Sequence, residues 1–333
     1  MSSGKKPSKA WGTEAPAGAN PGTSIEGLRG ESDILERIDG WVEELLAHRQ
    51  VKPSAWKLRP LDYFEGRSFG SSVTVPGSVL QHQIEHRVSP PPATLRSDQV
   101  RAYVAHLEPG DILVTRRASR RTSLSVPGYW THLALYVGTP NQLDAFFEDL
   151  PATSKRSASE LIFAACPLAD GALGAPDAEG YPTSVLEAGH RGVILTAFEA
   201  CGAADCLAVL RPRISKAKRL QGLLASFEHL GKPFDYSFDF ASDAALSSSE
   251  LIYRSYPKLE PLQARDVGGR ELITANEVVE RWAVQKSERD VGDLEFVLFL
   301  DGQGKLGKYT SEDATALTQS HQRPKWGQRH PSS

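Results

Sequence analysis

The chain has 333 residues, a formal net charge of -3 at pH 7, and 40% hydrophobic residues. This length can bury a sizeable core as one large domain or two smaller ones. Because the charges nearly balance and form no long run of one sign, we expect no nucleic-acid partner. The three cysteines, Cys166, Cys201 and Cys206, are too few for a disulfide scaffold, which indicates a reducing compartment or use in the core.

Two segments precede the main pattern. Residues 1–30 are rich in Gly, Pro, Ala and Ser and are expected to be disordered. Residues 31–93 are expected to form a helical and irregular extension, because apolar residues recur at helical spacing from Ile34 to Leu46. We find no transmembrane stretch and no apolar core of a signal peptide behind the basic start. We therefore predict a cytoplasmic protein, or one delivered by a secretion route without a conventional signal peptide.

Residues 94–305 alternate strands and helices. Ser97 is expected to cap a short helix that stops at Pro109 and Gly110. The strand candidates in chain order are DILVTRR, THLALYVG, VLEA, GVILTAF, CLAVLRP and LEFVLFLD. Helices are predicted for the segments Leu220–Leu230, with Gly231 to end it, Ser248 to Pro257, and Asn276 to Trp282. This order predicts an α+β domain, an antiparallel sheet with helices to one side.

Two further segments stand out by composition. Residues 145–183 are rich in Ala, Gly and Pro, and a loop of this length is usually disordered or functional. We predict a lid or specificity loop there, whose deletion should change substrate choice more than folding. Residues 306–333 are polar and are expected to be a flexible tail.

Three polar residues lie where strands or a helix would hold them: His132 in THLALYVG, Glu187 in VLEA, and Ser248 in SSSELIYRSY. A nucleophile, a base and a residue that orients the base are the minimal parts of covalent acyl transfer. A histidine in a strand is also a common structural residue, and serines before a helix commonly cap it. The spacing alone leaves both interpretations open.

Six segments in order, EPGDILVTRR, PGYWTHLALYVG, VLEAGHRGVILTAF, GKPFDYSFDF, SSSELIYRSY and LEFVLFLD, resemble the permuted papain-fold hydrolases of the YiiX/YebB-like group, relatives of the NlpC cell-wall peptidases. The resemblance runs from about Glu108 to Asp301 and implies a circularly permuted papain-like fold. It implies His132 as the base and Glu187 as the residue that orients it. The family's nucleophilic cysteine, in a Cys-Ser/Thr-Glu-Leu motif, corresponds to Ser248.

A serine at this position changes the chemistry. A helix N-terminus and an imidazolium can hold a thiol ionised, whereas a hydroxyl needs a base to take its proton during attack. Ser248 is therefore a Cys→Ser substitution made to trap a substrate, a natural loss that leaves a binding protein, or a working serine nucleophile. The three cysteines of the chain are expected to be buried small hydrophobic residues, and none lies at the helix start where the nucleophile would be.

The resemblance also suggests substrate-binding residues. Tyr129 and Trp130 flank the histidine and would line an acyl pocket, with a core role as the alternative. Phe234 stands where the family often has a tyrosine, and Ser249 follows the nucleophile position. Asp111 would approach the wall of the site or hold a turn by side-chain hydrogen bonds.

The resemblance therefore predicts a thiol hydrolase or acyltransferase that acts on an amide, thioester or ester, with a peptide or acyl-bearing substrate and no cofactor. A metal site is not expected, since Cys201, Cys206 and His190 lack a second tight ligand pair. The alternative is a catalytically inactive binding module that recognises a peptide or acyl group in the same cleft.

Overall fold

The structure, a computed structural model, describes residues 93–117, 126–235, 238, 240, 244–266, 271–289 and 291–325. The segments predicted for residues 1–30 and 31–93 lie outside these residues, apart from residue 93. Within the described ranges, no helix has both the length and the apolar character needed to cross a bilayer.

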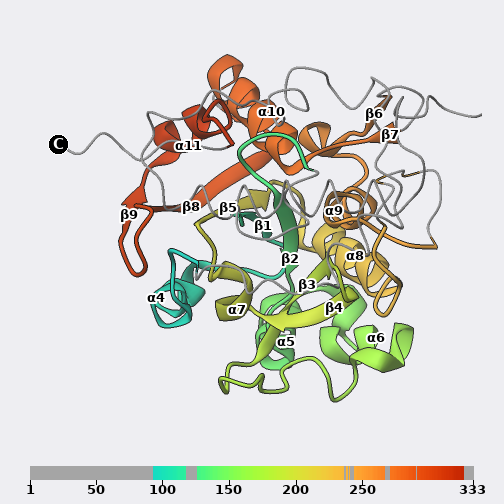
Figure 1. Cartoon of the computed structure of the whole chain (residues 1–333). Helices are drawn as coiled ribbons and strands as arrows, with labels where there is room; N and C mark the ends of the chain where they lie inside the picture. The colour runs from blue at the N-terminus through green and yellow to red at the C-terminus, as the bar shows by residue number, and fades with distance from the viewer. Residues whose placement is uncertain are drawn as a thin grey trace, which may run out of the picture.

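A seven-stranded antiparallel sheet forms the centre of the fold, in the order β4-β3-β2-β1-β5-β8-β9 (Figure 1). Its strands are β1 (Ile112–Arg116), β2 (His132–Tyr136), β3 (Thr183–Gly189), β4 (Gly192–Ala197), β5 (Cys206–Pro212), β8 (Leu294–Gly302) and β9 (Tyr309–Glu312). A small second sheet pairs β6 (Arg265–Asp266) with β7 (Glu271–Leu272). The α+β class with an antiparallel sheet is confirmed.

The helices connect and cover these strands. The α-helices are α4 (Ser97–Arg101), α5 (Pro140–Phe147), α6 (Ala158–Ala165), α7 (Phe198–Gly202), α8 (Lys216–Phe227), α9 (Ser248–Ser255), α10 (Ala275–Glu288) and α11 (Ala314–Ser320). Short 3₁₀ turns are η2 (Val104–His106), η4 (Pro151–Thr153), η5 (Pro167–Ala169) and η6 (Glu260–Leu262). The cap expected at Ser97 is wrong, because Ser97 is the first helical residue and Arg96 precedes it as the N-cap.

Helices cover both faces of the sheet. Along β2, Leu133 and Leu135 pack in the core that α8, α9 and α10 share, whereas Ala134 and Tyr136 pack with α4 and α7 (Figure 1). This follows from the alternation of side chains in a strand. The expectation of helices on one side is therefore wrong: the short α4 and α7 cover the second face.

The direction of α9 relative to β2 is set at both ends of the helix. Just after its last residue, Tyr256 Oη donates to the carbonyl of Gly110 at 3.1 Å. The N–H of Gly110 in turn donates to the carbonyl of Tyr136, the last residue of β2, at 2.8 Å. At its start, Leu246 bridges to Phe234, just beyond a segment in which Gly231 N donates to the carbonyl of Val193. Helix α9 therefore begins at the end of the sheet where β2 begins, which we call the His132 end.

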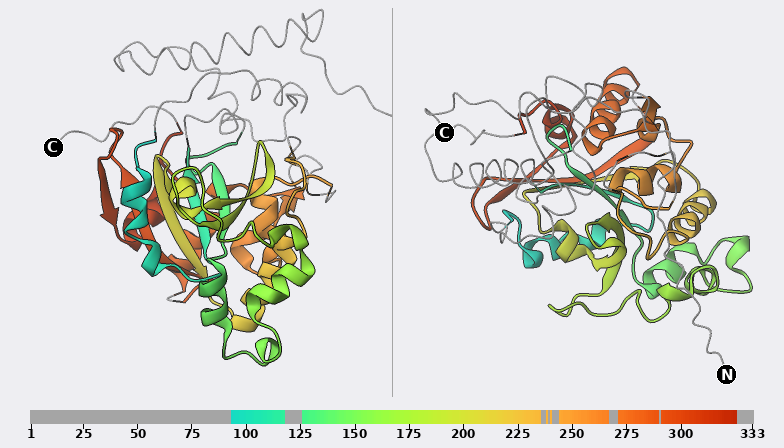
Figure 2. Two further views of the ribbon diagram at one scale, coloured as in Figure 1. Left: turned by 90° about the horizontal axis from the view of Figure 1, so that it is seen from below. Right: turned by 45° about the vertical axis from the view of Figure 1, so that its right-hand side comes forward.

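The segment 145–183 is folded and contributes to the core. Ser157 caps α6 in a capping box with Glu160, and α6 packs against α8 beside the sheet (Figure 2). Its buried apolar side chains are Phe147, Ala158, Ile162, Cys166, Ala169 and Leu173. The expectation that its deletion would alter specificity more than folding is not compatible with this packing, because the deletion would open the core.

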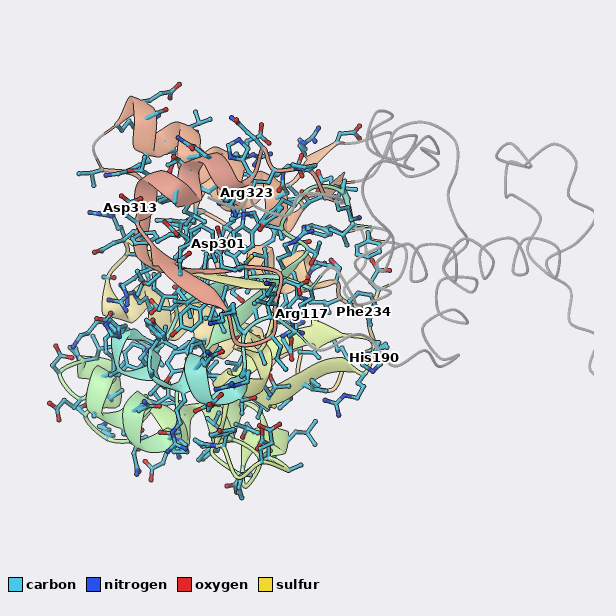
Figure 3. The ribbon with its side chains drawn as sticks, turned by 60° about the vertical axis from the view of Figure 1, so that its left-hand side comes forward. Arg117, His190, Phe234, Asp301, Asp313 and Arg323 are labelled. Carbon is cyan, nitrogen blue, oxygen red and sulfur yellow. The ribbon has the colours of Figure 1, made fainter. Side chains whose placement is uncertain are left out.

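The flexible tail predicted from residue 306 is wrong over the described residues. Strand β9 pairs with β8, and α11 places Leu317 in the main core. Beyond α11, the Arg323 guanidinium binds the Asp301 carboxylate at 2.7 Å (Figure 3), and the side chain of Lys325 donates to the carbonyl of Val126. Polar composition does not predict this order, because apart from Leu317 these residues bind through side-chain charges and backbone groups.

Candidate active site

His132 and Glu187 form a largely buried hydrogen-bonded pair. Their Nε2 and Oε2 atoms are 2.7 Å apart, and the two side chains are 13% and 9% exposed. The register of β2 and β3 explains the contact, since Glu187 pairs with Ala134 and so lies on the same face as His132. The structure thus brings together the two residues expected to form a base and its orienting carboxylate.

Arg117, which the sequence patterns did not identify as a site residue, contacts the carboxylate of this pair. Its Nη1 lies 3.4 Å from the same Oε2 of Glu187, and its Nη2 donates to the carbonyl of Cys201 at 2.5 Å. The Cys201 thiol lies 3.9 Å from that carboxylate oxygen. A signal was present, because alternation in DILVTRR places Arg117 on the same face as the buried Leu113 and Thr115. Figure 3 shows Arg117 at the same edge as His190 and Phe234.

Ser248 is the first residue of α9, and it does not cap the helix. The cap is Ser247, whose Oγ accepts from the N–H of Glu250 at 3.3 Å. Ser248 is partly exposed, whereas Ser247 and Ser249 are buried. Capping therefore accounts for the first serine of the triplet and leaves the second with a side chain at the helix start.

Ser248 and the His132–Glu187 pair lie at the same end of the sheet but on different faces. His132 and Glu187 share the face of α7, since Ala134 and Val185 pack there, whereas Leu251 and Ile252 of α9 pack on the opposite face. Both β2 and α9 begin at this end. A side chain at 248 can approach the imidazole only around the start of β2, beyond the first rung of the ladder.

Glu250 has an unusual environment one turn into α9. Its carboxyl is fully buried, Arg254 binds Oε1 at 2.7 Å, and no described residue hydrogen-bonds Oε2. Burial raises the pKa of Glu250 to about 7, although the contact with Arg254 opposes the rise. The lost hydration of a buried carboxylate outweighs its ion pair here.

The raised pKa of Glu250 predicts a pH-dependent stability. Because the folded-state pKa, about 7, lies above the usual 4.5, the contribution of Glu250 is fully present below pH 4.5 and is lost as pH rises through 7. Between pH 4.5 and pH 7, we expect the contribution of Glu250 to the free energy of unfolding to fall by about 1.4 kcal/mol per pH unit. Urea titrations of the full chain and of Glu250→Gln at several pH values measure this, and an identical pH dependence in both would contradict it.

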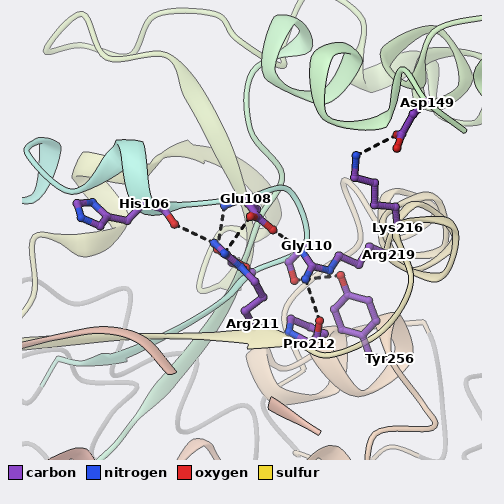
Figure 4. Close-up of polar contacts among 10 residues, drawn as sticks. His106, Glu108, Gly110, Asp149, Arg211, Pro212, Lys216, Arg219 and Tyr256 are labelled. Carbon is purple, nitrogen blue, oxygen red and sulfur yellow. Dashed lines mark hydrogen bonds and ion pairs between the residues drawn. The ribbon is translucent and has the colours of Figure 1, made fainter. Parts of the chain in front are cut away.

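Asp111 lies at the opposite end of the sheet from His132. Its fully buried carboxylate accepts from Arg211 Nε and Nη2, both at 2.8 Å, and from the N–H of Glu108 at 2.9 Å. Burial raises the pKa of Asp111, and Arg211 counteracts the rise. Glu108 also binds Arg219 (Figure 4). These contacts correspond to the turn-holding alternative, so the placement of Asp111 in the substrate wall is corrected.

Trp130 and Tyr129 have core contacts. Trp130 is fully buried, and its Nε1 donates to Ser320 Oγ at 2.8 Å. The hydroxyl of Tyr129 lies 3.1 Å from the Cys206 sulfur, and the Arg116 guanidinium lies 4.2 Å from the centre of its ring. The core alternative therefore describes both residues, and neither lines an acyl pocket among the described contacts.

The two remaining predicted substrate residues lie at the His132 end. Phe234 is buried, with its ring centre 5.9 Å from that of Phe238 in an edge-on contact. Ser249 is buried in the first turn of α9. Both belong to the elements that lead into and form the start of that helix.

The described residues contain no group of three or more His, Cys, Asp or Glu side chains placed to hold a metal ion. The three cysteines are buried, as predicted. A cavity of about 190 Å³ lies at the other end of the sheet, and none of the predicted site residues lines it; its wall includes Arg213, Trp282, Lys286 and Phe296.

Comparison with known proteins does not extend this description. No protein-family model, no curated protein and no solved structure matches the chain.

Proposed function

We propose that this chain is a permuted papain-like hydrolase or acyltransferase that acts on an amide, thioester or ester, with position 248 as the site of attack. The observation that carries the proposal is the largely buried His132–Glu187 hydrogen bond of 2.7 Å at the end of the sheet where α9 begins. A carboxylate that orients an imidazole is the arrangement that a general base requires.

In the proposed reaction, the atom at position 248 attacks the carbonyl carbon and its proton passes to the His132 imidazole. The carbonyl oxygen becomes an oxyanion, which the N–H of residue 248 and a neighbouring donor at the start of α9 would stabilise. The tetrahedral species then expels the leaving group, which takes the proton from the imidazolium. Water or another acceptor removes the acyl group from residue 248. Glu187 keeps the imidazole oriented throughout.

The test restores the family's thiol. Ser248→Cys should react with a fluorescent iodoacetamide and with a thioester acyl donor, and His132→Gln in that background should slow the reaction by about 10²-fold or more. Ser249→Cys is the matched control, because residue 249 lies in the same turn but is buried. The native cysteines are buried and should give little background. A Ser248→Cys rate that is the same with and without His132 would exclude a shared site.

The binding module is the second candidate, and the serine at position 248 favours it. A module of this kind would keep the His132–Glu187 pair as a structural contact. Two results together would support the module over the enzyme. Ser248→Cys would be labelled at the same rate with and without His132, and an acylated peptide would bind saturably to the chain but not to Ser248→Trp.

A further inference from the structure

A buried arginine lies against the His132–Glu187 pair and is held at both its backbone and its side chain. The Arg117 side chain is only 5% exposed. Its N–H donates to Thr131 Oγ1 at 3.1 Å, and Thr131 directly precedes His132. Its guanidinium reaches Glu187 with one nitrogen and the Cys201 carbonyl at the end of α7 with another. Arg117 therefore contacts the segment that carries the base and also the carboxylate that orients it.

The charge of Arg117 matters because the carboxylate is buried. A buried anion next to an imidazole favours the imidazolium, which cannot accept a proton from a nucleophile. A guanidinium stays protonated at all working pH values and offsets the carboxylate, so the imidazole need not be charged. The two nitrogens that bind Glu187 and the Cys201 carbonyl use the fixed fork of arginine, which lysine cannot reproduce.

We propose that Arg117 is a positioning residue for the His132–Glu187 pair: it holds the Glu187 carboxylate beside the imidazole and supplies the counter-charge that leaves His132 neutral and able to act as a base. This inference rests on the proposed function for its catalytic meaning. Its electrostatic part concerns the imidazole itself and can be measured without any reaction.

In the described part of the chain, several charged and titratable groups lie on the elements that surround the imidazole. Arg117 directly follows β1, Glu187 belongs to β3, and the Cys201 thiol belongs to α7, with Glu199 earlier on that helix. The turn between β3 and β4 adds His190 and Arg191. Glu250 belongs to α9, which packs on the other face.

The experiment compares three variants of the full chain by NMR titration of the His132 imidazole, with His132→Gln used to assign its signal. Arg117→Gln should move the titration midpoint upward by about one pH unit, a tenfold change in protonation at fixed pH. Arg117→Lys keeps the charge and should recover most of the shift. Arg116→Gln is the matched control, because Arg116 stacks on Tyr129 on the opposite face of β1 and should leave the midpoint unchanged.

The same substitutions in the Ser248→Cys background separate the two hypotheses. If both hold, labelling of Ser248→Cys should depend on His132, and its pH profile should change in Arg117→Gln together with the imidazole midpoint. If the imidazole midpoint moves but the labelling rate is the same with and without His132, the proposed function fails and the electrostatic role of Arg117 stands. An unchanged midpoint in a folded Arg117→Gln overturns the role. If Arg117→Gln does not fold, a midpoint in Arg117→Lys that is higher than in Arg116→Gln by more than half the expected shift overturns the counter-charge part of the role, because a positive charge at this position would then not keep the midpoint low.

Discussion

Removal of residues 148–182 is expected to abolish cooperative unfolding. This part of the chain contains α6 and the side chains that fill the space between α6, α8 and the sheet. Without them the core of the α8 face would be open to water, and the loss would exceed the 5–15 kcal/mol, roughly, by which a domain of ordinary stability is held folded. Thermal unfolding followed by circular dichroism, in the full chain and the deletion, measures the effect.

Two point substitutions in the same segment refine this prediction. Ile162→Ala should lower the free energy of unfolding by about 2–5 kcal/mol, because Ile162 is fully buried. Leu168→Ala should change it by less than about 0.5 kcal/mol, because Leu168 is 66% exposed. A deletion that unfolds cooperatively near the temperature of the full chain would restore the interpretation of the segment as a detachable lid.

Glu187→Ala is expected to lower the free energy of unfolding by about 3–5 kcal/mol, irrespective of any catalytic role. The substitution removes the carboxylate that faces both Arg117 and His132 in a buried site, and breaking one side of a buried ion pair leaves an uncompensated charge. Urea unfolding measures the loss. Arg117→Met in the Glu187→Ala background should recover part of it, since the buried guanidinium is then also gone.

The control for Glu187→Ala is an ion pair on the surface. Asp149 binds Lys216 at 2.9 Å, with side chains that are 61% and 40% exposed. Asp149→Ala should cost no more than about 1 kcal/mol, because exposed pairs are weak. Equal losses for Glu187→Ala and Asp149→Ala would show that the contacts of Glu187 contribute no more than surface contacts.

Local patterns were sufficient for most of the fold. Alternation of apolar residues located six of the seven strands of the main sheet, and helical spacing located α8, α9 and α10, because these periods depend only on neighbours in the chain. The C-terminal elements β9 and α11 were missed for the opposite reason. Polar residues in α11 and just beyond it bind partners in other elements, such as Trp130 for Ser320 and Asp301 for Arg323.

The candidate site shows the same division. His132, Glu187 and Ser248 could be named from the sequence and its resemblance, and β-sheet register then joins the first two in a hydrogen bond. Asp111 and Trp130 were placed beside a substrate, yet their contacts are with Arg211 and Ser320. Residue type could not distinguish a structural role from a substrate-binding role, because a buried structural aspartate and an active-site aspartate are the same letter in the sequence.

The sequence by itself determined the positions of six strands of the main sheet and of α8, α9 and α10, and which side chains share a face within each of those strands, because backbone geometry imposes these periods locally. Only the tertiary structure decided that Arg117 reaches Glu187, that α9 lies across the sheet from the imidazole while beginning at the same end, and that residues 145–183 close the core. Those outcomes depend on strand register and on which helix covers which face, and both are set by packing between segments far apart in the chain.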